Sequence, residues 1–135
     1  MLLTHIINKP AEVVFNFLAD TGKFVSVHPV ITKMKPLENN KFLVFETLKA
    51  GFLSHSFTYT VIIEADKENN KIVMTAIVMK RTRIKMTFTI TESNSYTLIN
   101  EEIIFHSWLP IKSLMQRIFK KQHILLFENI ANSRN

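Results

Sequence analysis

The sequence predicts a single α+β domain in which a curved antiparallel sheet of about seven strands packs against one long C-terminal helix. Alternating apolar and polar residues fill most of the segment 31–108, which is typical of strands with one buried face. The turns between these strands are too short for crossover helices, so neighbouring strands are expected to run antiparallel. After Pro110 the apolar residues recur with a helical period, long enough to cover one face of the sheet.

Length and composition favour one globular domain over residues 1–135. Of these residues 47% are hydrophobic, and eleven are phenylalanine, enough apolar surface for a core. The chain has no cysteine, so disulfides and thiolate chemistry are excluded. The N-terminal segment lacks the basic start and long apolar run of a secretory signal, and no stretch approaches the roughly 18 apolar residues of a membrane span. We therefore expect a cytoplasmic protein without a transmembrane segment.

The first thirty residues are predicted to form a short strand and two short helices. The strand covers Thr4–Ile7. Pro10 suits the first position of a helix, where its missing N–H is not needed. A second helix is expected over Lys23–His28, because the residue before Pro29 is biased away from helical conformation. Both helices are too short to form the main cover of the sheet.

Six further strands complete the predicted sheet. They are expected at Ile31–Lys35, Lys41–Leu48, Ser54–Asp66, Lys71–Met79, Thr82–Thr91 and Tyr96–Trp108. Two of the intervening turns contain Asn-Asn, at Asn39-Asn40 and Asn69-Asn70, and asparagine favours tight turns. Within the fifth of these strands, Met86 and Phe88 share an apolar face, which therefore needs a cover.

The C-terminal helix is predicted to run from Pro110 to about Asn132 and to provide that cover. Its apolar stripe is expected to consist of Ile111, Leu114, Met115, Ile118, Leu125 and Leu126. Gln122 and Asn129 return to this stripe. A buried amide is costly unless it is hydrogen-bonded, so each of the two either has a partner in the core or lines a pocket.

Two carboxylates are predicted to point toward the interior. In the last strand, Glu101 shares the more apolar face with Ile103 and Phe105. Glu46 shares a face with apolar neighbours in the same way. Burial raises the pKa of a carboxyl group unless a cation pairs with it. Each residue is either a cavity group or part of a sheet edge or salt bridge.

The histidines do not indicate a metal site. The five of them show no metal-ligand spacing, so neither a metal nor another cofactor is expected. His55 alternates with Phe57 and Tyr59 on one face, which suggests a cavity wall with polar tips, although the pattern favours an edge histidine and a core tyrosine slightly more. With only two glycines, a phosphate-binding loop is not expected.

The chain is basic, with a net charge of +6 and a pI near 9.7. Much of the positive charge lies in two groups: Lys80, Arg81, Arg83 and Lys85, and Lys112, Arg117, Lys120 and Lys121. No motif of a sequence-specific nucleic-acid binder accompanies them. These groups are either solvated surface or a site of weak contact with an acidic partner, such as an anionic ligand, RNA or a membrane surface.

The order of these elements resembles the helix-grip superfamily (SRPBCC), which includes START lipid-transfer domains, polyketide cyclase/dehydrase-like proteins and birch-pollen-allergen-like proteins. The residues that carry the resemblance are the segment Ile6–Phe15, the segment Phe24–Pro29, and Glu101–Phe105 followed by Leu109-Pro110. The resemblance implies a hydrophobic ligand held between the long helix and the sheet. It implies no catalytic residue, since the superfamily shares none.

The leading functional hypothesis is binding of a hydrophobic small molecule, for transport or sensing. The predicted ligand-cavity residues are His55, Phe57, Tyr59, Met86, Phe88, Glu101, Ile103, Met115, Ile118 and Gln122. One alternative is an enzyme of the cyclase, dehydrase or isomerase type, with Glu101 or His55 as general base and Tyr59 or Gln122 polarising a carbonyl. Another is a macromolecular binder that uses the basic face of the C-terminal helix.

Overall fold

The computed structural model describes residues 1–134, apart from the side chain of Ala50, and contains seven strands and three helices in this part of the chain. The strands are β1 (Leu2–Ile7), β2 (Ile31–Pro36), β3 (Lys41–Ala50), β4 (Leu53–Asp66), β5 (Lys71–Val78), β6 (Thr82–Glu92) and β7 (Thr97–His106). The helices are α1 (Ala11–Ala19), α2 (Thr21–Val27) and α3 (Lys112–Ala131). The predicted α+β class and order of elements are confirmed.

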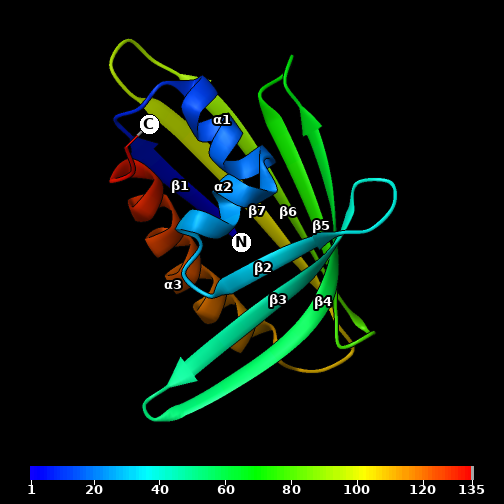
Figure 1. Ribbon diagram of the computed structural model, residues 1–135. Helices are drawn as coiled ribbons and strands as arrows, with labels where there is room; N and C mark the ends of the chain where they lie inside the picture. The colour runs from blue at the N-terminus through cyan, green and yellow to red at the C-terminus, as the bar shows by residue number, and fades with distance from the viewer. Residues whose placement is uncertain (135) are drawn as a thin grey trace.

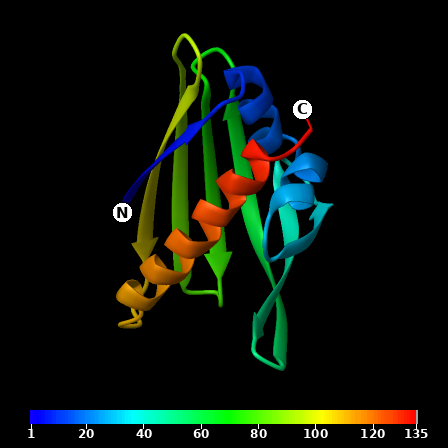
Figure 2. The same cartoon turned by 90° about the vertical axis from the view of Figure 1, so that its left-hand side faces the viewer.

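All seven strands form one antiparallel sheet in the order β1-β7-β6-β5-β4-β3-β2. Consecutive strands from β2 to β7 are neighbours, as expected of a meander, and β1 pairs with β7 at the far edge. The sheet curves around α3, while α1 and α2 lie over the same face (Figures 1 and 2). This is the helix-grip arrangement.

The break between the two short helices is built around Asp20. Its side chain accepts a hydrogen bond of 3.0 Å from the backbone N–H of Lys23 and so caps the start of α2. An aspartate in this position satisfies an N–H group that has no partner within the helix. Helix α2 therefore begins at Thr21, two residues before the predicted start at Lys23.

The C-terminal half of helix α3 buries a different face from the predicted one. Its buried residues are His123, Leu126, Phe127 and Ile130, whereas Leu125 is 43% exposed. The observed stripe is rotated from the predicted one by roughly 100°, or one residue position. The predicted stripe is confirmed for Leu126, which is buried, and for Ile111, Leu114, Met115 and Ile118, which face the space between α3 and the sheet. It was wrong for Leu125, because α3 carries apolar residues on both sides.

The two halves of α3 also differ in their packing. The C-terminal half packs against the core, and Asn129 donates a hydrogen bond of 2.8 Å to the backbone carbonyl of Val27 at the end of α2. In the N-terminal half Leu114 is 53% exposed, and only Met115 and Phe119 pack partly against the core. One half therefore anchors the helix and the other leaves space beneath it.

Within residues 1–134, none of the helices has the length and apolar character of a membrane span.

Candidate functional site

A cavity of about 540 Å³ lies between the N-terminal half of α3 and the sheet. Most of its lining is apolar, contributed by β3, β4, β5, β6 and α3. Eight of the ten predicted cavity residues line it: His55, Phe57, Tyr59, Met86, Phe88, Met115, Ile118 and Gln122. Their contact with a ligand remains a prediction.

The structure does not bring Glu101 and Ile103 to the cavity wall. Both residues lie on β7 and are fully buried. Glu101 lies behind His123 of α3, to which it is hydrogen-bonded. The sequence pattern predicted the inward direction of Glu101 and missed the two imidazoles that contact it.

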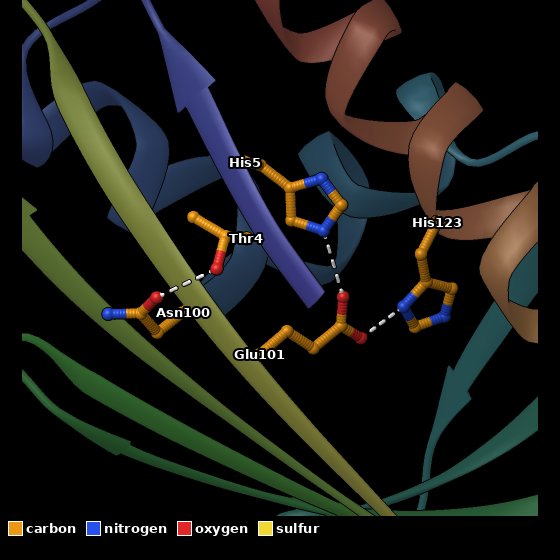
Figure 3. A network of polar contacts seen from close by, with 5 residues as sticks. All are labelled: Thr4, His5, Asn100, Glu101 and His123. Carbon is orange, nitrogen blue, oxygen red and sulfur yellow. Dashed lines mark hydrogen bonds and ion pairs between the residues drawn. The ribbon is translucent and has the colours of Figure 1, made fainter. Parts of the chain in front are cut away.

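Glu101 is the centre of a buried polar network (Figure 3). One carboxylate oxygen accepts a hydrogen bond of 3.2 Å from Nε2 of His5 on β1, and the other accepts a hydrogen bond from Nδ1 of His123. Burial opposes ionisation of Glu101, but the charges and hydrogen bonds of His123 and His5 outweigh it and hold its pKa below the usual value. The carboxylate is therefore ionised, and both histidines act as donors.

Aromatic packing holds the two rings that bind Glu101. His5 stacks on Phe127 with 4.0 Å between ring centroids. His123 contacts Phe119 at 5.4 Å and lies parallel to Phe88 at 6.3 Å. Because its Nδ1 atom is committed to Glu101, His123 has only Nε2 left for another partner. His123 lines the cavity, so Nε2 is the atom a ligand could contact.

His28 contributes a second imidazole to this end of the cavity. Its Nδ1 atom accepts hydrogen bonds from the backbone N–H groups of Val30 and Ile31, at 3.2 and 3.1 Å. Burial, together with the nearby His123, lowers the pKa of His28 to about 3. The ring is therefore neutral at pH 7 and carries its hydrogen on Nε2.

The rings of His28 and His123 lie edge to face, with 6.4 Å between centroids, and both line the cavity. Among residues 1–134, no buried side-chain nitrogen or oxygen lacks a hydrogen-bond partner. The Nε2 atoms of the two rings have no such partner, so both are accessible. The Nε2 atom of His28 offers an N–H donor, and the Nε2 atom of His123 is the second imidazole nitrogen that a ligand can reach. The sequence pattern does not predict either residue as part of the site.

Glu46 and Tyr59 form the other polar pair of the cavity. The Tyr59 hydroxyl donates a hydrogen bond of 3.1 Å to Oε1 of Glu46, from the neighbouring strand. Burial raises the pKa of Glu46, although the Tyr59 hydrogen bond and His123 partly oppose this. Burial and the adjacent Glu46 raise the pKa of Tyr59 well above its usual value. This pair can therefore interact with a ligand mainly through hydrogen bonds.

Toward the outside, His55 is exposed and stacks on Phe57 at 5.9 Å, which in turn contacts Tyr59 at 6.0 Å. This row of rings along β4 lines one side of the cavity. Within the described part of the chain, no group of three or more histidine, aspartate or glutamate side chains is placed to hold a metal ion. Apart from its few polar groups, the site is apolar.

No protein-family model and no curated protein sequence matches the chain. Many solved structures share its fold. The di-domain ARO/CYC BexL from the BE-7585A biosynthetic pathway aligns with a TM-score of 0.78 and 11% identity over 97% of this chain and 44% of its own. A START superfamily protein from Mycobacterium smegmatis aligns with a TM-score of 0.73 and 14% identity, covering 97% and 93% of the two chains.

Norcoclaurine synthase from Thalictrum flavum gives a TM-score of 0.71 and 12% identity over 97% of this chain and 83% of its own. These likenesses define the class: the chain has the helix-grip fold of the START-like and polyketide cyclase-like proteins. At such low identity the likeness shows the fold alone. The function has to be argued from the residues of this cavity.

Proposed function

We propose that this protein binds a hydrophobic small molecule, as a carrier or sensor, in the cavity between α3 and the sheet. The observation that carries the proposal is the cavity itself, which measures about 540 Å³ and has a mainly apolar lining. Sites for organic ligands commonly measure roughly 300–1,000 Å³ and combine apolar walls with a few orienting polar groups. The histidine pair and the Glu46–Tyr59 pair provide such groups here.

The placement of the polar groups supports one orientation of the ligand. His28 and His123 lie together at one end of the cavity, 6.4 Å apart, so one oxygen-containing group of a ligand can reach both rings. The apolar body of the ligand would then lie against Met86, Phe88 and Ile118. Glu101 acts through His123 in this arrangement and does not touch the ligand.

The experiment is a ligand screen on purified protein by native mass spectrometry and thermal unfolding, with lipids, quinones and aromatic polyketides as the panel. A ligand present at about 100 times its Kd stabilises the folded state by about 2.7 kcal/mol, which corresponds to a rise in Tm of roughly 10 °C. Absence of any bound compound and of any rise in Tm would contradict the proposal.

A pair of variants locates the binding. Ala76 lines the cavity, so Ala76→Phe is expected to fill part of it and to abolish the rise in Tm. Thr75 is the neighbouring residue on the opposite face of β5, so Thr75→Phe makes the same kind of change outside the cavity and is expected to leave binding intact. Equal loss in both variants would place the ligand elsewhere.

The Glu101–His123 pair favours a second candidate function, an enzyme of the cyclase, dehydrase or isomerase type. His123 would be the general base and Glu101 its positioning residue, because a carboxylate on Nδ1 fixes the tautomer that exposes Nε2. This differs from the expectation that Glu101 itself is the base, since both of its oxygens are engaged. His28 N–H would stabilise the developing oxyanion.

The step would transfer a proton from the carbon next to a ketone carbonyl to His123 Nε2, as the C–H electron pair forms an enolate. Returning the proton to carbon restores the imidazole, with no net oxidation.

The test is deuterium exchange into 2-tetralone in D₂O, followed by NMR. His123→Asn, which keeps a donor for Glu101, is expected to slow exchange about a hundredfold, and His55→Asn to have no effect. Binding without exchange would exclude this candidate.

A further inference from the structure

One end of the molecule gathers the turns that follow β3 and β5 and the segment that joins β7 to α3. Alternate turns of an antiparallel meander lie at the same end, and Figure 2 shows all three segments at the lower end of the molecule. The β5–β6 turn and the β7–α3 segment are neighbours, whereas the β3–β4 turn stands apart from them (Figure 1). Met79 and Leu114 line the cavity and are 65% and 53% exposed. The cavity therefore reaches the surface at this end.

Large apolar side chains project from all three segments. Phe52 at the β3–β4 turn is 96% exposed, and Leu53 beside it is also exposed. Trp108, between β7 and α3, is 67% exposed. We call Phe52, Leu53, Met79, Trp108 and Leu114 the mouth surface. Large exposed apolar side chains concentrated at one end of a molecule are suited to contact with a broad apolar surface.

The charge around the mouth surface has one sign. Residues 47–63, 69–91 and 103–127, which include all three segments, contain no aspartate or glutamate but ten of the chain's 17 lysines and arginines. Lys49, Lys80, Arg81 and Lys112 are exposed at or close to the three segments. The guanidinium of Arg81 lies 5.7 Å from the centroid of the Trp108 ring, so apolar and cationic groups are interleaved here.

The β5–β6 turn adds an independent observation. Met79 and Lys80 both have positive φ values, 53° and 63°, a region that residues other than glycine, asparagine and aspartate rarely adopt. At the β2–β3 turn, at the opposite end of the sheet, the residues with positive φ are Asn39 and Asn40, which suit such turns. The β5–β6 turn instead has a methionine and a lysine at its positions of positive φ. This conformation costs free energy, and the local structure of the turn does not explain it.

We propose that the mouth surface docks on an anionic lipid bilayer. Aromatic and long aliphatic side chains favour the interface between headgroups and acyl chains, and lysine and arginine are attracted to anionic headgroups. An RNA partner would use the cations but not Leu53, Met79 and Leu114. Docking would place the cavity opening at the bilayer, so that an apolar guest could enter without crossing water. The proposal does not depend on the identity of that guest.

The chain contains a single tryptophan, Trp108, which makes it an intrinsic reporter. The experiment titrates the protein with phosphatidylcholine vesicles with and without about 30% phosphatidylglycerol, at about 0.05 M and about 0.5 M NaCl, and follows Trp108 fluorescence and vesicle sedimentation. The proposal predicts a blue shift and sedimentation with the anionic vesicles at low salt, and weaker binding with neutral vesicles or high salt.

Matched variants separate docking from folding. Phe52→Ser is expected to weaken vesicle binding about tenfold, whereas Ile6→Ser, at a residue 67% exposed on β1, is expected to have no effect. Met79→Asn should weaken binding yet raise Tm, because asparagine tolerates positive φ. Reversing the charges of Lys80 and Arg81 together should weaken binding at least about tenfold, and Lys41→Glu, near the β2–β3 turn, should not.

Three results would overturn the proposal. The first is no binding to anionic vesicles by the unmodified protein. The second is equal binding by Phe52→Ser and the unmodified protein. The third is tighter binding to a single-stranded RNA oligonucleotide than to the vesicles, which would identify the basic end as a nucleic-acid surface.

Discussion

Glu101 on β7 accepts a hydrogen bond from Nδ1 of His123 on α3, which ties the long helix to the sheet at the inner end of the cavity. Glu101 is fully buried, and His123 lines the cavity. The Glu101 carboxylate therefore stabilises the fold, and the Nε2 atom of His123 remains available to a ligand. Figure 3 shows His5 completing the network from the edge strand.

Replacing Glu101 by glutamine should destabilise the fold. An amide has one acceptor oxygen in place of two, so one histidine N–H would remain buried without its partner. We expect the free energy of unfolding to fall by roughly 2–4 kcal/mol, measured by urea denaturation. Glu102 lies on the exposed face of the same strand, so Glu102→Gln is the control and should change stability by less than about 0.5 kcal/mol. Similar effects in the two variants would contradict the role of the network.

The stability of the protein should decrease as the pH falls from about 6.5 toward 3. His28 is neutral in the folded state, with a pKa lowered to about 3, whereas in the unfolded chain it binds a proton below about pH 6.5. The unfolded state therefore binds more protons in this window, and stability is lost as the pH falls. Below about pH 4.5 protonation of Glu101, whose pKa is lowered by folding, adds to the loss.

His28→Asn isolates this contribution. Asparagine keeps an acceptor for the N–H groups of Val30 and Ile31 but does not titrate. Between pH 7.5 and 5.5, we expect the variant to lose about 1 kcal/mol less stability than the unmodified protein. His106 is exposed, so His106→Asn should leave the pH dependence unchanged. Identical pH dependence in His28→Asn and the unmodified protein would mean that folding does not shift the pKa of His28.

The face that α3 presents to the sheet can be tested with two alanine variants. Phe127 is buried and stacks on His5, so Phe127→Ala should cost about 3–5 kcal/mol. Leu125 is 43% exposed, so Leu125→Ala should cost less than about 1 kcal/mol. Urea denaturation of both variants measures the difference. A larger loss of stability in Leu125→Ala than in Phe127→Ala would mean that the stripe predicted from the sequence is the buried one.

Strand periodicity predicted the sheet well because a side chain alternates between only two faces. This rule placed Glu101 inward, in agreement with its complete burial, and grouped His55, Phe57 and Tyr59, which all line the cavity. Helix periodicity was less informative. Ile124 and Leu125 lie on the exposed side of α3, so apolar character alone could not identify the buried face.

The histidine pair could not be predicted from sequence spacing. His28 and His123 are far apart in the chain and meet only because the end of α2 and the middle of α3 cover the same face of the sheet. One local signal was present: Phe119, His123 and Phe127 recur every four residues, which is the spacing of one helix face. The cavity volume depends on how the N-terminal half of α3 sits above the sheet, which no local pattern specifies.

The central claim, that an organic guest occupies this cavity, can be tested most directly through the methionines. Of the six methionines in the chain, Met34, Met74, Met79, Met86 and Met115 line the cavity and Met1 does not. In NMR spectra of protein labelled with ¹³C at the methionine methyl groups, titration with a compound from the ligand screen should shift the five cavity signals and leave the Met1 signal in place. If the bound compound leaves the five cavity signals unchanged, the guest is not in the cavity and the account is wrong.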